Sequence, residues 1–146
     1  SEGVRFELWK AAAVIFTEHP IFGIGSGQFN DALKEKIGAG EIPPIQIFDH
    51  AHSEPLQILA TTGIIGFLSY IFLYAGSAYY FYSSLTPNST YKIRYLSILG
   101  LILVGGFFIF GLTNYSFGHQ VMVLFFAVMV VSISGMIKSI EAEENA

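Results

Sequence analysis

A long stretch with almost no charge limits the folds that this chain can adopt. Between Pro55 and Ile137 the only charged residues are Lys92 and Arg94, and all 11 acidic residues lie outside this stretch. A domain of this size buries only part of its surface, so a soluble fold could not keep such a stretch away from water. We therefore predict an integral membrane protein of the all-α class, a polytopic protein whose spanning helices follow an extramembrane helix and loop.

Three apolar segments approach or exceed the roughly 20 residues that a membrane-spanning helix needs. We expect spans at Pro55–Tyr82, Tyr95–Leu112 and Val121–Ile137, polar turns at Ser83–Arg94 and Thr113–Gln120, and a polar tail over Lys138–Ala146. The basic residues Lys92, Arg94 and Lys138 then share one side of the membrane, which the positive-inside tendency makes cytoplasmic. Residues 1–54 are then expected to lie on the outer side and to carry the candidate site, and residues 55–146 to be part of one larger membrane domain.

The first element is expected to be a helix over Arg5–Glu18. Its apolar residues Phe6, Trp9, Ala13 and Phe16 recur with helical spacing and form one apolar stripe, which is expected of an interfacial helix or of the tail of a span. His19 and Pro20 end the helix, because a residue before proline avoids the α region. The apolar part of this helix is too short to span a membrane.

The segment between this helix and the first span is polar and rich in glycine and proline. Gly23–Gly27 resembles a phosphate cradle, but no strand precedes it and no Lys-Ser/Thr follows it, so a turn with positive φ is the better interpretation. Phe29–Ile37 is expected to be a short helix capped by Asn30. The remainder is expected to be a loop outside the membrane.

Two histidines lie directly before the first span. His50 and His52 are flanked by Asp49 and Glu54, and in an extended segment both imidazoles would point to the same side. An imidazole has a pKa near 6.5 and can act as a general base near neutral pH. Two alternatives stay open: a metal site, for which His-x-His supplies too few ligands on its own, and polar residues that merely cap a helix at the interface.

Arg5 is the second candidate. If its helix lies near the membrane face, the guanidinium can hold a phosphate with two parallel hydrogen bonds, which lysine does less well. The alternative is a solvated arginine at a helix end. His19 and His119 are expected to be a helix-terminal and a turn residue, without a role in the site.

Several motifs occur in a distinctive order. They are Arg5-x-x-x-Trp9, His19-Pro20-x-Phe22-Gly23-x-Gly25-x-Gly27-x-Phe29, and, after a polar loop, His52-Ser53-x-x-Leu56-Gln57 followed by Gly63-Ile64-Ile65-Gly66 and a span. In this order and spacing the sequence resembles the O-antigen ligase and O-antigen polymerase superfamily. The resemblance covers Arg5–Tyr82 closely and the later spans in topology only. It implies that the chain is a C-terminal part of a longer protein and is inactive alone.

The resemblance also implies an activity and a location. Members are multi-pass glycosyltransferases of the bacterial inner membrane that move a glycan from an undecaprenyl-diphosphate carrier to an acceptor hydroxyl on the periplasmic face. The acceptor would be lipid A core, another glycan or a protein, and membrane lipids surround the enzyme. Arg5 would bind the diphosphate in place of a metal, and His52 would deprotonate the acceptor, with inversion at the anomeric carbon. His50 and Trp9 are expected to bind substrate, and no cofactor is expected.

Other functions are less well supported by the sequence. A transporter or channel with histidines in a proton relay would need ionisable groups within the spans, which are almost absent, and a non-catalytic assembly segment would tolerate change at the site. A net charge of −4 without a basic patch argues against a nucleic-acid partner. The absence of cysteine excludes disulfides and thiolate chemistry.

Overall fold

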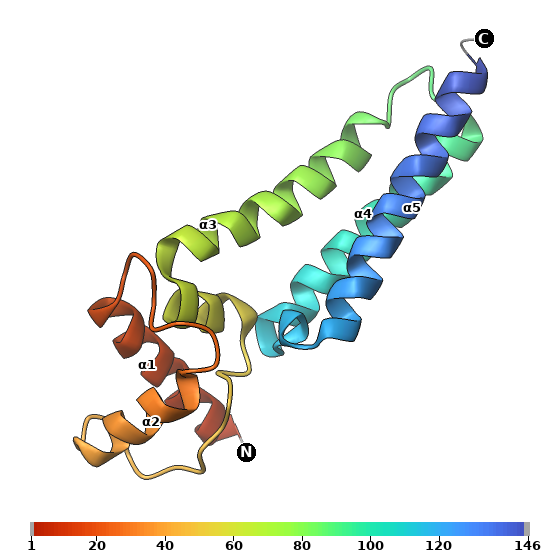
Figure 1. Cartoon of the computed structure of the whole chain (residues 1–146). Coiled ribbons are helices and arrows are strands. Elements are labelled where there is room, and N and C mark those ends of the chain that lie inside the picture. The colour runs from red at the N-terminus through yellow and green to blue at the C-terminus, as the bar shows by residue number, and fades with distance from the viewer. Residues whose placement is uncertain (1, 145–146) are drawn as a thin grey trace. The chain divides into compact units, whose positions relative to one another are not determined.

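The computed structural model describes residues 2–144, which form α-helices and one short 3-10 helix and contain no strand (Figure 1). The elements are α1 (Glu2–Glu18), α2 (Phe29–Gly38), α3 (Glu54–Ser83), α4 (Tyr91–Thr113), η1 (Ser116–Gly118) and α5 (Gln120–Glu144). The helices α3, α4 and α5 are each long and apolar enough to cross a membrane. The predicted all-α class and the predicted three spans are therefore confirmed.

The chain divides into two compact units. The first runs through Ile71 and also includes Gly111–Tyr115, so it holds α1, α2, the beginning of α3 and the end of α4. The second comprises Phe72–Phe110 and the described chain from Ser116 onward. The boundary predicted after residue 54 separates water-facing from membrane-facing residues. It divides the chain differently from these two units, and it stays a prediction.

The core of the first unit forms between α1 and α2. Its fully buried side chains include Leu8, Ala11, Ala12 and Ile15 of α1 and Phe29 and Leu33 of α2. The predicted helix is thus confirmed. Its apolar stripe is not the face that packs into this core, because Phe6 is 56% exposed, Ala13 is exposed, and Trp9 and Phe16 are only partly buried. The two small alanines offer α2 a flat surface, and this surface, rather than the aromatic face, is the one that α1 buries.

Polar contacts fasten α2 to its surroundings. The Lys36 ammonium lies in a nearly buried position and pairs with Glu18 at the end of α1 and with Glu41 in the following loop. Asn30 does not cap α2 as predicted, because the helix begins after Gln28 and no side chain caps it. The Asn30 amide instead donates to Asp49 Oδ1 (2.8 Å), which ties α2 to the segment before α3.

The first spanning helix is broken at Gly63, which has φ 65° and ψ −162°. The Ala60 and Thr61 carbonyls would accept hydrogen bonds from Ile64 and Ile65 in a continuous helix. They accept instead from Ile24 and Gly25 (3.0 and 2.8 Å), while Ile64 and Ile65 donate to Pro20 and Ile21 (2.8 and 3.5 Å). The segment after α1 thus supplies partners for the two carbonyls and the two N–H groups that the break takes out of the helix.

Two glycines make this exchange sterically feasible. A Cβ at Gly63 would overlap the backbone of Ile21, and a Cβ at Gly23 would overlap the backbone of Thr61. Both glycines also have positive φ (65° and 66°). The sequence analysis expected positive φ in the Gly23–Gly27 turn, which is confirmed, but it did not predict the break in α3.

In the second unit the remaining part of α3 packs with α4, η1 and α5 through aromatic rings. The Tyr74 ring centroid lies 5.4–5.7 Å from those of three phenylalanines, which are Phe108, Phe117 and Phe126. The Tyr80 hydroxyl donates to the Ser134 carbonyl of α5 (3.2 Å). These contacts hold the three apolar helices together within this unit.

The helices extend further than predicted at the end that carries the basic residues. α4 begins at Tyr91, and the Arg94 guanidinium donates to backbone carbonyls of the preceding turn, those of Thr86, Pro87 and Ser89. α5 continues to Glu144, so the expected polar tail is helical as far as it is described, and positions 145 and 146 lie outside the described residues. Charged residues thus continue these helices beyond their apolar parts.

Candidate functional site

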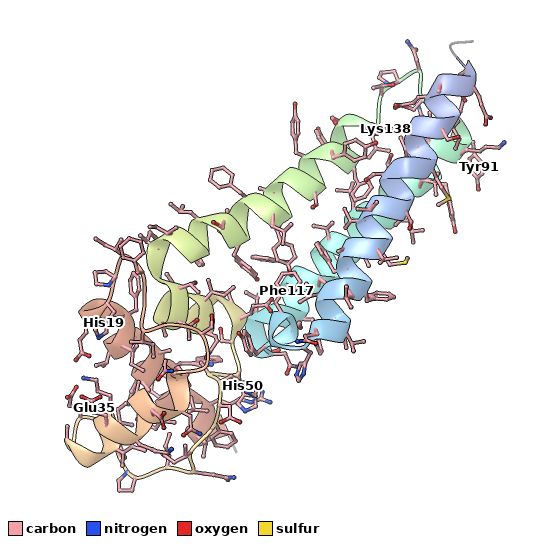
Figure 2. The ribbon with its side chains drawn as sticks, viewed as in Figure 1. His19, Glu35, His50, Tyr91, Phe117 and Lys138 are labelled. Atoms are coloured by element: carbon pink, nitrogen blue, oxygen red, sulfur yellow. The ribbon has the colours of Figure 1, made fainter. Side chains whose placement is uncertain are left out.

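The histidine pair lies on the short segment that leads into α3 (Figure 2). The imidazole centroids of His50 and His52 are 4.3 Å apart, and the His52 ring also meets Phe48 edge-on at 5.3 Å. The expectation that both rings lie on one side is confirmed, but the segment is not simply extended. His52 has φ 51°, a left-handed conformation that non-glycine residues seldom adopt and that is often found at functional sites.

A glutamine in the first turns of α3 fixes this segment. The Ala51 N–H donates to Gln57 Oε1 (2.8 Å), and both residues are buried. The Gln57 N–H in turn donates to the Ser53 carbonyl (2.9 Å). The motif containing Gln57 was noted in the sequence, but its role as a clamp on the residue between the two histidines was not predicted.

Arg5 acts electrostatically on His52. Burial and, second to it, the positive charge of Arg5 hold the pKa of the His52 imidazole below its usual value of 6.5. Arg5 itself is exposed on α1. The first unit therefore brings together the two residues that the sequence singled out, and it keeps the imidazole neutral near pH 7.

Trp9 lies one turn after Arg5, so the two side chains share a face of α1. Its indole Nε1 is buried and has no hydrogen-bond partner among the described residues. Buried N–H groups are usually paired, and those that are not call for an explanation. An oxygen of a bound substrate is one partner that would satisfy it.

Three residues near the pair were missed as site residues. Glu54 is fully buried at the start of α3, and the Tyr70 hydroxyl lies 3.5 Å from its Oε2. The Tyr115 ring, which comes from the end of the α4 segment, lies 5.6 Å from His50. Burial and the nearby Glu54 raise the pKa of the Tyr115 phenol. The position of an acid at the start of an apolar run could have indicated Glu54 as a site residue. No local sequence pattern indicates Tyr70 or Tyr115.

The other polar candidates lie elsewhere. His19 and His119 are exposed, and Figure 2 shows His19 apart from His50 within the first unit. Among residues 2–144, no three side chains of histidine, aspartate or glutamate come together as metal ligands. The chemistry that this arrangement offers is an imidazole with a lowered pKa within the electrostatic reach of an exposed guanidinium.

Comparison with known proteins identifies the part of the chain that carries this arrangement. Residues 1–71 match the family model described as O-antigen ligase, and this match ends where the first unit leaves α3. The chain is also 24% identical over 135 residues to a Haemophilus influenzae protein described as uncharacterised, an alignment that covers 91% of this chain and 34% of that protein. The chain thus spans about a third of that relative's length. The region that holds Arg5 and His52 is thus similar to the O-antigen ligase family, and the three long apolar helices make the chain a membrane protein.

Proposed function

We propose that this protein transfers a glycan from an undecaprenyl-diphosphate carrier to an acceptor hydroxyl at the periplasmic face of the bacterial inner membrane. The observation that carries the proposal is the pairing of Arg5 with His52 directly before the first spanning helix, inside the region that matches the family. The acceptor is a hydroxyl of lipid A core, of another glycan or of a protein.

Arg5 binds the diphosphate of the donor. Its guanidinium can form two parallel hydrogen bonds with phosphate oxygens, and its charge does not depend on pH in the physiological range. Negative charge grows on the diphosphate as the glycosidic bond breaks, so a cation fixed there lowers the barrier without a metal ion. Trp9, on the same face of α1, supplies an indole N–H for an oxygen of the donor.

His52 takes the proton from the acceptor hydroxyl. The lowered pKa means that the imidazole is already neutral near pH 7 and is ready to accept a proton. The imidazolium formed next to Arg5 would be unfavourable alone, but the bound diphosphate places negative charge beside both cations. The hydroxyl attacks one face of the sugar while the diphosphate leaves from the other, so the anomeric configuration inverts. His50 contacts the sugar or the acceptor from its position against His52.

The position of His52 at the membrane boundary agrees with the proposed transfer from a lipid-linked diphosphate. His52 lies two residues before α3, and the diphosphate of a polyprenyl carrier lies among the lipid headgroups while its hydrocarbon chain lies in the bilayer. The basic residues Lys92, Arg94 and Lys138 favour a cytoplasmic location for the opposite ends of the spans. These observations support a site that faces the periplasm.

Transfer in membranes that contain the intact protein tests the proposal. Undecaprenyl-diphosphate-linked glycan is supplied, and its consumption is measured together with the glycosylated acceptor. His52→Ala should abolish transfer at an unchanged amount of inserted protein, whereas His19→Ala, which removes an exposed imidazole from the same unit, should leave transfer intact. Transfer by His52→Ala at the wild-type rate would rule out the base, and loss of transfer on adding a chelator would favour a metal site.

A further inference from the structure

A buried carboxylate lies directly behind the histidine pair. Glu54 is completely inaccessible to solvent, although it is the first residue of α3. Burial of a carboxylate is costly unless charges or hydrogen bonds compensate for it. Its position in the first turn gives some compensation through the helix dipole, and the Tyr70 hydroxyl approaches Oε2 at 3.5 Å, which is long for a hydrogen bond.

The last part of α4 closes over this carboxylate. A Cβ added at Gly111 would lie 2.5 Å from Glu54 Oε2 and 3.4 Å from Glu54 Cβ, so only glycine allows the helix to come this near. Gly111–Tyr115 accordingly belongs to the first unit, although the rest of α4 belongs to the second. Glu54 is therefore the contact that holds the end of α4 against the segment before α3.

The ring of Tyr115, which follows α4 in the chain, packs against the histidine pair. The Tyr115 ring is half-buried and lies 5.6 Å from the His50 ring at an interplanar angle of 31°. His50 in turn lies 4.3 Å from His52. Since burial and Glu54 raise the pKa of Tyr115, its hydroxyl stays protonated throughout the physiological range. Ring contacts thus link Tyr115 through His50 to His52, and Glu54 lies beside Gly111, at the start of the segment that ends with Tyr115.

On the basis of the transfer reaction proposed above, we propose that Glu54 and Tyr115 are positioning residues of the site. Glu54 anchors the end of α4, the Tyr115 ring then confines His50, and His50 restricts the His52 imidazole to the orientation in which it meets the acceptor hydroxyl. This extends the site beyond the region that matches the family, because residue 115 lies outside residues 1–71. Neither residue touches the reacting atoms.

Chemical labelling tests the positioning without requiring activity. Diethyl pyrocarbonate modifies neutral imidazoles, and mass spectrometry of the intact membrane protein gives a rate for each histidine at a pH where all are neutral. Tyr115→Leu and Gly111→Ala should raise the labelling rate of His50 several-fold, with His19 unchanged as an internal reference. Gly105→Ala is the matched control on α4, because a Cβ there meets nothing within 4 Å.

Rescue variants separate positioning from a general loss of structure. Tyr115→Phe keeps the ring and should retain the slow labelling of His50, and Glu54→Gln should retain it better than Glu54→Ala. Transfer by Tyr115→Leu should fall about 10- to 100-fold in kcat with little change in KM for the donor, the size of effect that a misplaced catalytic group produces.

Two results would overturn the inference. One is a labelling rate of His50 in Tyr115→Leu and Glu54→Ala equal to that of the wild type. The other is altered labelling with unchanged kcat, which would make the contacts structural only. Failure of the proposed function is a separate result, since it would show as normal transfer by His52→Ala whatever the labelling rates are.

Discussion

Replacing Gly63 with alanine tests how the broken helix is held to the segment after α1. Gly63 has a combination of φ 65° and ψ −162° that is almost restricted to glycine. A Cβ at this position would also overlap the carbonyl of Ile21. The variant must therefore accept a strained backbone and also move the segment away from α3.

The size of the effect follows from these two costs. A side chain in this region of φ and ψ costs about 1–3 kcal/mol. Moving the segment weakens the two hydrogen bonds that Ile64 and Ile65 donate to Pro20 and Ile21, each worth about 0.5–1.5 kcal/mol. The sum is about 2–6 kcal/mol, a large part of the roughly 5–15 kcal/mol that stabilises a typical domain.

Hydrogen exchange measured by mass spectrometry on the protein in nanodiscs reports this loss locally. The lower bound of this loss, about 2 kcal/mol, corresponds to amide exchange that is about 30-fold faster. The affected amides are those of Ile24, Gly25, Ile64 and Ile65. Gly76→Ala is the matched control, because a Cβ there meets nothing within 4 Å and alanine favours a helix by up to about 1 kcal/mol. If Gly63→Ala and Gly76→Ala exchange equally slowly at these amides, the reasoning is refuted.

Three further predictions concern the site and the second unit. Because neutral His52 is the active form and its pKa lies below 6.5, kcat/KM for transfer should keep more than half of its plateau value at pH 6.5 and should reach half of it at a lower pH; a midpoint above pH 6.5 would contradict this. Arg5→Lys should lower kcat/KM about 10- to 150-fold, the value of one charge-assisted hydrogen bond of about 1.5–3 kcal/mol, and an unchanged value would argue against a two-bond contact. Arg94→Ala should speed amide exchange in the turn at residues 84–90 but not at Ile24 and Gly25, and equal effects at both would show that the turn is not a local feature.

The spans were predictable because their signal is local and strong. An apolar run of sufficient length has few alternatives to a membrane helix, and all three runs form one. The ends were less predictable, since Lys92 and Glu141 lie within helices that continue past the apolar parts. The apolar stripe of α1 was visible in its spacing, but it did not indicate that Leu8, Ala11, Ala12 and Ile15 form the buried face.

The break in α3 was not predictable from local pattern. Gly63 within an apolar run is compatible with a regular helix. Only the Pro20–Gly25 segment, far away in the sequence, makes the break favourable, because it supplies four backbone hydrogen bonds where the break removes two. Tertiary contacts therefore decided this feature against the local preference of the chain.

The candidate site was accessible to sequence analysis in part. Spacing alone indicated that His50 and His52 would lie together, and the type of residue indicated Arg5. Glu54 is next to the histidines in the sequence but was not given a role. Tyr115 lies beside His50 because Gly111–Tyr115 belongs to the first unit. Contacts of that kind depend on helix packing, which the spacing of residues does not encode.

The central claim is that Arg5 and His52 face one another in a single site, and titration of His52 tests it most directly. The rate of carbethoxylation of His52 is followed against pH in wild type and in Arg5→Gln, with His19 as the reference. Removing the Arg5 charge removes one of the two causes that lower the pKa of His52, so its midpoint should move to higher pH while that of His19 stays in place. Identical midpoints for His52 in the two proteins would contradict the claim.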